Sequence, residues 1–174
     1  MIRAILVGIG VILVTVLVYA AIQPDEFRVE RSTRIDATPA EIAPLIADLH
    51  RFNEWNPYAK KDPAMKQSYS GPTNGPGAAY AWQSAEVGAG SMEIVDVEFP
   101  SRVAIDLDFE SPFEAHNAVE FSLVPNGDAT DVTWKMTGPQ TYLSKLMGLV
   151  LDMDSMVGTD FETGLADLKS IAER

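Results

Sequence analysis

The chain has 174 residues with 25 acidic and 13 basic side chains, a formal net charge of −12 and no cysteine. The lack of cysteine excludes disulfides, thiol nucleophiles and thiolate metal sites. The acidic balance argues against a protein that grips phosphate backbones, so we expect no nucleic-acid partner and repulsion from anionic lipid surfaces.

The N-terminal segment is the least polar part of the chain. From Ala4 to Ile22 it carries no charge and is almost wholly aliphatic. An uncharged apolar run of roughly 18 or more residues is long enough to cross a bilayer as a helix. Arg3 precedes the run and Asp25 follows it, which favours a cytoplasmic N-terminus. We therefore expect residues 1–23 to be a transmembrane anchor, with the rest on the outer, periplasmic or extracellular, side of a bacterial cytoplasmic membrane.

A cleaved signal peptide is the alternative interpretation of this segment. The tripeptide Val18-Tyr19-Ala20 fits a signal peptidase site loosely. Against cleavage, the positive region is a single Arg, and the apolar run exceeds the usual core of about 7–15 residues. Both interpretations export residues 24–174, which form a domain one charge unit more negative than the whole chain.

The first strand and the first helices follow in order. Residues 27–35 alternate apolar and polar, which predicts a strand with one face on a core, and Arg31 falls in the inward phase. Thr38, Pro39 and Glu41 predict a helix start with a capping box. The apolar stripe that follows predicts a helix that breaks near Asp48, with a second short helix to about residue 54.

The middle of the chain predicts a meander of antiparallel strands. We expect a connection at residues 60–66, a loop at 70–77, a strand at 79–85, a turn at 87–90, and a strand at 91–99 with a bulge at Ile94-Val95. Clean alternation then predicts strands at 103–110, 117–123 and 132–137, with a hairpin signal at 125–128.

The C-terminal segment changes to helical spacing. Apolar residues recur every three to four positions from Leu143 to Ile171, and Asp152 could cap a restart that divides the segment into two helices. Gly148, Gly158 and Gly164 are costly in a helix and suggest a break or a close approach to the sheet. The predicted fold class is α+β: a curved antiparallel sheet of about six to seven strands wrapped around a long C-terminal helix, with two short helices after the first strand.

This layout resembles the helix-grip, or SRPBCC, superfamily of START-related and polyketide-cyclase-like proteins, and its bacterial membrane-anchored members most closely. The resemblance rests on five stretches: residues 29–42, 52–57, 77–82, 88–94 and 160–165. It implies a hydrophobic cavity between the sheet and the last helix, used in most members to bind apolar ligands. It implies no catalytic signature.

The candidate cavity follows from the inward strand phases and from the stripe of the last helix. Its predicted lining is Arg31, Tyr80, Trp82, Phe109, Asn117, Phe121, Trp134, Met136, Met153, Val157 and Phe161.

Two of these residues have open roles. Arg31 either binds a ligand carboxylate, pairs with an acid of the last helix such as Asp160 or Glu162, or extends to the strand edge, and we favour the structural role. Asn117 either orients a polar ligand group or makes a hydrogen bond at a strand start.

No pattern of catalytic or metal-binding residues accompanies the cavity. His50 and His116 lack ligand spacing, no serine sits in a nucleophile elbow, and the pair Asp152 and Asp154 suits helix capping. We expect no cofactor, no metal and a monomer. The leading function is non-catalytic binding of a lipid or other hydrophobic small molecule. The alternatives are a polyketide cyclase or hydratase that uses a cavity carboxylate, and a packed module without ligand.

Overall fold

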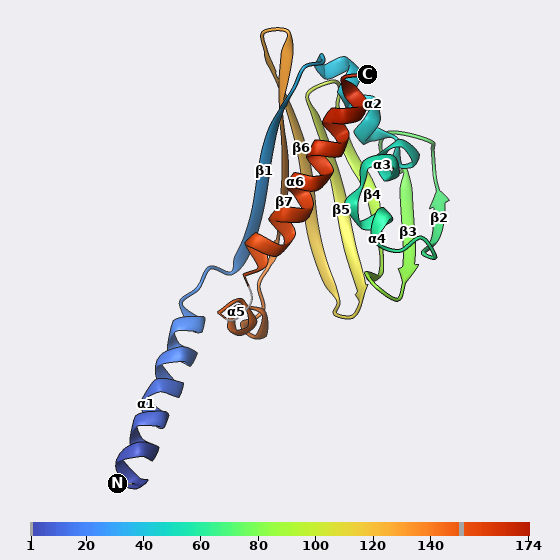
Figure 1. The fold of residues 1–174 in the computed structure, drawn as a ribbon. Helices are drawn as coiled ribbons and strands as arrows, with labels where there is room; N and C mark the ends of the chain where they lie inside the picture. The colour runs from blue at the N-terminus through green and yellow to red at the C-terminus, as the bar shows by residue number, and fades with distance from the viewer. Residues whose placement is uncertain (1, 150–151) are drawn as a thin grey trace.

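The computed structural model describes residues 2–149 and 152–174. Within these residues, seven strands form one antiparallel sheet in the order β1-β7-β6-β5-β4-β3-β2 (Figure 1). The strands are β1 (Glu26–Ile35), β2 (Lys66–Ser70), β3 (Ala79–Ser84), β4 (Gly88–Glu98), β5 (Arg102–Ser111), β6 (Ala115–Asn126) and β7 (Ala129–Pro139). The helices are α1 (Ile2–Ala21), α2 (Pro39–Ala47), α3 (Leu49–Trp55), α4 (Pro57–Lys61), α5 (Tyr142–Gly148) and α6 (Met153–Ala172).

The N-terminal segment forms a helix, as its sequence predicts. The helix α1 leaves the domain at the end where α5 lies (Figure 1). In the part of the chain that the structure describes, no helix has the length and apolarity of a membrane span. The transmembrane assignment of this segment therefore stays a prediction.

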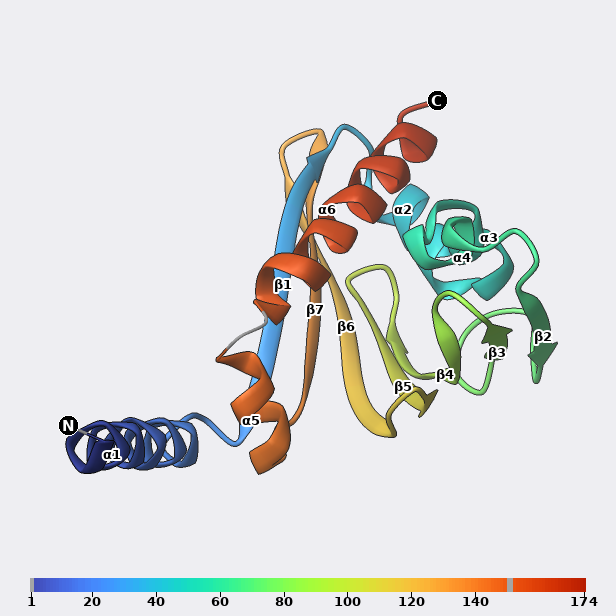
Figure 2. The same cartoon turned by 60° about the horizontal axis from the view of Figure 1, so that its bottom comes forward.

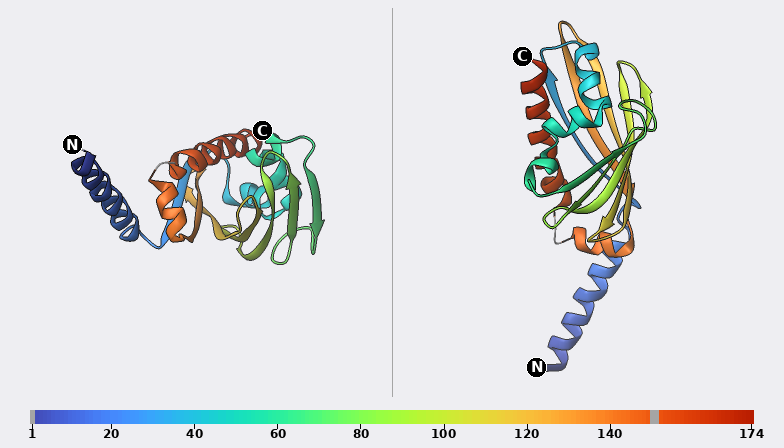
Figure 3. Two further views of the ribbon diagram at one scale, coloured as in Figure 1. Left: turned by 90° about the horizontal axis from the view of Figure 1, so that it is seen from below. Right: turned by 90° about the vertical axis from the view of Figure 1, so that its right-hand side faces the viewer.

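The helices gather on the concave face of the sheet. The right-hand view of Figure 3 shows α2, α3, α4 and α6 on one side, while the opposite face of the sheet carries no helix among the described residues. The last helix, α6, arches over the concave side and crosses the strands obliquely (Figure 2). This arrangement confirms the predicted helix-grip architecture.

The strand register follows the predicted alternation. In β6 and β7 the inward residues Phe121 and Trp134 face each other directly. The pairing of β4 with β5 shifts between Ile94 and Asp96, which confirms the predicted bulge. The β6–β7 hairpin turns through Gly127, whose φ of 67° favours glycine.

Three parts of the predicted layout were wrong. Three short helices, α2, α3 and α4, follow β1, where two were predicted. Residues 88–90 belong to β4 and not to a turn, because each pairs with β3 in the sheet ladder. The predicted connection at residues 60–66 begins within α4, which Asn56 caps by accepting a hydrogen bond from the Tyr58 backbone amide at 3.1 Å.

The helices after β1 begin where their caps predict. Glu41 accepts hydrogen bonds from both the amide and the hydroxyl of Thr38, at 2.8 Å each. The first of these helices ends at Asp48, whose carboxylate caps α3 by accepting from the His50 amide at 2.9 Å. Inside the core, the indole of Trp55 donates to the carbonyl of Leu45 at 2.9 Å.

The C-terminal segment forms two helices, which is one of the two arrangements that its sequence left open. The N-terminus of α6 is capped by Asp152, which accepts from the Ser155 amide at 3.0 Å. The side chains of Phe161, Leu165 and Leu168 on α6 are fully buried against the sheet. Each buried apolar side chain of this size contributes roughly 1.5–3 kcal/mol to the burial free energy.

Candidate functional site

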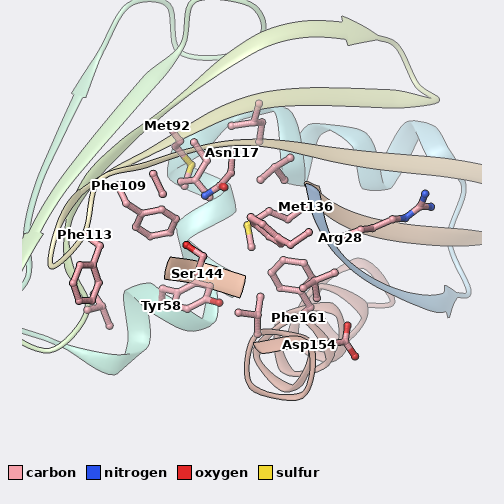
Figure 4. Close-up of a pocket in the computed structure, with 18 of the residues that line it drawn as sticks. Arg28, Tyr58, Met92, Phe109, Phe113, Asn117, Met136, Ser144, Asp154 and Phe161 are labelled. Atoms are coloured by element: carbon pink, nitrogen blue, oxygen red, sulfur yellow. The ribbon is translucent and has the colours of Figure 1, made fainter. Parts of the chain in front are cut away.

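A cavity of about 1190 Å³ lies between α4, α5, α6 and the half of the concave face that α2 and α3 leave uncovered. Figure 4 shows that Phe109, Asn117 and Met136 reach into it from the sheet, Tyr58 from α4 and Phe161 from α6. Its strand wall is formed by the inward residues of β3 to β7: Tyr80, Trp82, Met92, Ile105, Leu107, Phe109, Asn117, Val119, Trp134 and Met136.

The concave face is divided between a packed half and a hollow half. Val103, Phe121 and Leu123 are buried in the hydrophobic core and do not line the cavity. Further along the same strands, Leu107 and Asn117 line it. The division arises because α2 and α3 cover one end of the sheet.

Most of the residues predicted for the cavity lie on its wall. Tyr80, Trp82, Phe109, Asn117, Trp134, Met136, Val157 and Phe161 all line it. The side chain of Met153 lies outside the described residues.

Phe121 does not reach the cavity, although its strand phase is inward. Its ring packs edge-on against Trp55, with centroids 5.8 Å apart, and tilted against Trp134 at 5.1 Å. The short helix α3 therefore occupies the space beside Phe121 that we predicted to be part of the ligand cavity.

Arg31 does not line the cavity either. Its Nε donates to Glu162 at 2.8 Å and its Nη2 to Asp154 at 3.0 Å, so that two acids of α6 hold the guanidinium. These hydrogen bonds raise the pKa of Arg31 and, from the other side, lower that of Asp154. The favoured structural pairing with α6 is present, through Glu162 as predicted and through Asp154, which was not predicted as a partner.

The same guanidinium explains one glycine of α6. A Cβ on Gly158 would overlap the guanidinium atoms of Arg31. A Cβ on Gly164 would likewise meet Trp134 at 2.8 Å and Pro57 at 3.0 Å. Both glycines allow α6 to approach its neighbours closely, which is one of the two roles that the sequence suggests.

The polar groups on the enclosed wall are uncharged. Burial raises the pKa of Tyr80 to about 12. Burial also raises the pKa of Tyr58, and the nearby Asp160 carboxylate adds to this effect. Both phenols are therefore neutral at physiological pH. Asn117 is 8% exposed, and its Oδ1 has no hydrogen-bond partner within the described residues.

The charged residues that line the cavity lie at its edge. Arg28, Glu114, Asp152 and Asp154 are all exposed. Figure 4 shows Arg28 and Asp154 pointing away from the centre of the cavity. No described carboxylate is therefore enclosed with the apolar wall in the way that a general base with a raised pKa requires.

The cavity opens at the end of the domain from which α1 leaves. Its exposed lining residues gather there: Phe113 in the β5–β6 turn is 70% exposed, Met147 on α5 is 41% and Leu149 is 36%. In Figure 3, α5 lies at this end, between the sheet and α1. We call these three residues, with their surrounding loop and helix, the mouth of the cavity.

Contacts with α1 and its linker position α5 at the mouth. The Lys145 ammonium is buried and donates to the carbonyl of Gln23 at 2.8 Å and to Asp25 at 2.5 Å. Tyr142 donates its hydroxyl to the carbonyl of Leu17 at 3.0 Å. The hydrogen bond from Lys145 lowers the pKa of Asp25, and its charge adds to this effect.

Sequence reasoning missed the parts of the wall that come from helices and turns. Leu107 and Val119 lie in the same inward phases as the predicted residues, so the alternation signal was available for them. For Tyr58 and Phe113 no such signal exists, because their place depends on how α4 and a turn pack in space. Met147 falls in the apolar stripe of the C-terminal segment, but its place at the mouth depends on how α5 packs.

The comparisons with known proteins agree with this geometry. The family model described as polyketide cyclase / dehydrase and lipid transport matches residues 26–173. A comparison with curated proteins found no match.

Several solved structures share the fold. Protein CV1439 from Chromobacterium violaceum is 12% identical, with a TM-score of 0.61, over 87% of this chain and 99% of that one. The Aha1 dimer from Colwellia psychrerythraea is 14% identical, with a TM-score of 0.60, over 84% and 96%. CalU16 from Micromonospora echinospora is 21% identical, with a TM-score of 0.55, over 86% and 87%.

At these identities the solved structures show the fold alone, whereas the family model matches nearly the whole domain. Together with the sheet that grips α6, that match shows that the chain belongs to the polyketide cyclase / dehydrase and lipid transport family, within the SRPBCC superfamily.

Proposed function

We propose that this chain binds a lipid or another hydrophobic small molecule in its cavity without transforming it, and that α1 holds it in a bacterial cytoplasmic membrane with the domain outside. The observation that carries the proposal is the cavity of about 1190 Å³ with its apolar wall. Pockets for drug-sized ligands enclose about 300–1,000 Å³. The space therefore suits a molecule of lipid size.

The chemistry of the wall supports binding over catalysis. Aromatic rings and flexible methionines such as Met92 and Met136 adapt to varied apolar shapes. The buried polar groups of the wall are the amides of Asn56 and Asn117, the phenols and the indole of Trp134, and the charged groups lie at the rim. This distribution orients a ligand without offering an enclosed acid or base.

Membrane attachment is supported by the sequence of the N-terminal segment. The uncharged run from Ala4 to Ile22 has the roughly 18 or more apolar residues that a bilayer-spanning segment needs. The charge placement, with Arg3 before the segment and Asp25 after it, favours a domain on the outer side. Membrane fractions washed with carbonate should retain the full-length chain, and release by carbonate would contradict the anchor.

Ligand extraction from the purified protein tests the binding itself. Full-length protein isolated from cells should release a hydrophobic molecule into organic solvent, in about one copy per chain. A variant with a filled cavity, Leu107→Trp, should release less. Equal amounts from both proteins would show that the molecule comes from co-purified membrane and not from the cavity.

A polyketide cyclase or hydratase is the second candidate, and the description of the matching family favours it. Such an enzyme needs a general base within reach of its substrate. Glu114 and Asp152 are the carboxylates beside the mouth that a substrate could meet, besides Asp154, which Arg31 holds. If the extracted molecule is chemically changed on incubation with the parent but not with Glu114→Gln or Asp152→Asn, catalysis replaces binding as the function.

We also propose that the chain acts as a single copy, because one chain supplies the whole wall of the cavity. Light scattering of the full-length protein in detergent should give the mass of one chain, corrected for the micelle.

A further inference from the structure

Asn117 is an amide in an otherwise apolar part of the cavity wall. It lies on β6 opposite Leu107 of β5, and Figure 4 shows it pointing into the cavity among Phe109, Met92 and Met136. It is 8% exposed, and its Oδ1 finds no hydrogen-bond donor in residues 2–149 and 152–174.

The orientation of the amide leaves one polar end for a ligand. Its Oδ1 lies so close to Gly138 that a Cβ there would overlap it. The Nδ2 at the other end of the planar group therefore points away from Gly138. Rotation of the amide by a half-turn exchanges the two ends, so the position can present either a donor or an acceptor.

An unpartnered buried amide destabilises the empty protein. A leucine has nearly the same shape as an asparagine and carries no desolvation penalty, so it would pack here at lower cost. Buried polar groups without a partner call for an explanation, and a bound hydroxyl that donates to Oδ1 after the half-turn is one; in the present orientation Nδ2 can donate to a ligand oxygen.

A second unpartnered group lies on the same wall. The indole Nε1 of Trp134 also has no partner among the described residues. Its ring is stacked on Phe161 with centroids 4.0 Å apart and meets Trp55 edge-on at 5.6 Å. Trp134 lines the cavity as well, but its ring is held by these contacts and its indole N–H can only donate, so the Asn117 substitutions decide which of the two groups binds a ligand oxygen.

The surroundings of Asn117 select against a charged ligand group. An ion moved from water into an apolar cavity needs an opposite charge beside it. Arg31, which could have bound a carboxylate, is held by Glu162 and Asp154 and does not line the cavity. The charged residues that do line it are exposed at the rim.

From these contacts we infer that the ligand is an uncharged, mostly hydrocarbon molecule whose hydroxyl or carbonyl oxygen hydrogen-bonds to Asn117. This inference rests on the proposed binding function and names its substrate class. Asn117 is the residue that distinguishes such a molecule from a plain hydrocarbon of equal length and from a fatty-acid anion.

Competition between matched ligands tests the inference. The full-length protein in detergent is incubated with equimolar cetyl alcohol, methyl tetradecyl ketone, hexadecane and palmitate at neutral pH. Bound molecules are then extracted and quantified by gas chromatography. The parent should prefer the alcohol and the ketone to the alkane, and bind palmitate least.

Substitution of Asn117 should remove the preference and leave the apolar binding. In Asn117→Leu the ratio of alcohol to alkane should fall about five- to tenfold, the effect of one lost neutral hydrogen bond. The ligand-free variant should melt at a higher temperature than the parent, because the unpartnered amide is gone. Asn126→Leu makes the same chemical change at an exposed position of β6 and should keep the parent's ratio.

The outcomes separate the inference from the function on which it rests. An unchanged alcohol-to-alkane ratio in Asn117→Leu, or in Asn117→Ala where leucine disturbs the fold, overturns the role of Asn117. Palmitate bound as well as the alcohol overturns the neutral ligand class. A parent that binds none of the four molecules refutes the proposed binding function itself.

Discussion

Arg31 shows how one side chain fastens the gripping helix to the edge of the sheet. It leaves β1 in the inward phase, yet its guanidinium lies across α6 and contacts Asp154 and Glu162 there. The absence of a side chain at Gly158 provides the space for this crossing. A charged residue in the inward phase is therefore satisfied at the margin of the core, as is typical of buried or half-buried arginines.

Adding one methyl group at Gly158 tests this crossing. Gly158→Ala should lower the free energy of unfolding by about 1–2 kcal/mol, because the overlap with Arg31 outweighs the gain in helix propensity. Gly148→Ala is the matched control, because a Cβ there meets nothing within 4 Å. In urea unfolding, the change in the free energy of unfolding relative to the parent should differ in sign or size between the two variants. Equal stabilities would show that Arg31 moves aside freely.

The same ion pair predicts a dependence of stability on pH. The hydrogen bond from Arg31 lowers the pKa of Asp154 below its ordinary value of 3.8. A carboxyl with a lowered pKa in the folded state contributes stability above the ordinary value, and this contribution is lost as the pH falls through the lowered pKa.

The parent should therefore be more stable than Arg31→Met near neutral pH, and this difference should shrink below about pH 4. Urea unfolding of both proteins across that range measures the difference. A difference that stays constant down to about pH 3 would mean that the Arg31–Asp154 pair contributes nothing to stability.

At the scale of elements, α5 is joined to α1 more than to α6. Its stripe of apolar residues continues the spacing of α6, but its buried Lys145 is bonded to the linker before β1. The direction in which α5 runs is set by these contacts, which join residues more than 100 positions apart in sequence.

Loss of the Lys145 contacts should loosen α5 locally. In Lys145→Met, amide hydrogens of α5 should exchange roughly fivefold faster, an effect of about 1 kcal/mol on local opening. Lys60→Met breaks an ion pair with Asp167 at the surface and serves as the control, since it should leave exchange in α5 unchanged. Equal protection of α5 in all three proteins, measured by mass spectrometry, would contradict this role.

The periodicity of apolar residues and the capping residues of helices made most elements predictable from sequence. Alternation found the strands from β5 to β7, and the irregular phase at Ile94 and Val95 found the bulge. The capping residues Thr38 and Asp152 located the starts of α2 and α6. The early start of β4 was missed because glycines at 88 and 90 favour turns locally, while pairing with β3 decides their conformation.

The candidate site could be predicted only in part. Alternation defines which face of a strand is inward, and so it found Phe109, Asn117 and Met136. It does not tell how far α2 and α3 reach over that face, and for that reason Phe121 was placed in the cavity. The contributions of α4 and α5 depend on packing between distant segments, which local patterns do not encode.

At the scale of the whole molecule, the division of the concave face makes a matched pair of substitutions possible. Leu107 and Val103 point inward from the same strand, the first into the cavity and the second into the packed core. Enlarging a side chain in a packed core costs about 1–3 kcal/mol, whereas a true void accepts it with little strain.

We therefore expect Leu107→Trp to fold with nearly parental stability and to bind a hydrophobic dye more weakly. Val103→Trp should lose about 1–3 kcal/mol in urea unfolding. Dye fluorescence and unfolding are measured on the same samples of full-length protein. A large loss of stability in Leu107→Trp, with dye binding unchanged, would mean that the cavity is filled by packing.

The position of the mouth beside α1 determines the kind of kinetics that ligand loading should follow. A water-borne binder of an insoluble molecule depends on rare collisions in solution, so its loading falls when everything is diluted. If α1 holds the chain in the bilayer, as proposed, the nearest store of ligand is the surrounding hydrocarbon. Loading then follows the mole fraction of ligand within that membrane. Dilution of the vesicles should leave the occupied fraction unchanged, and dilution of the ligand among other lipids should lower it.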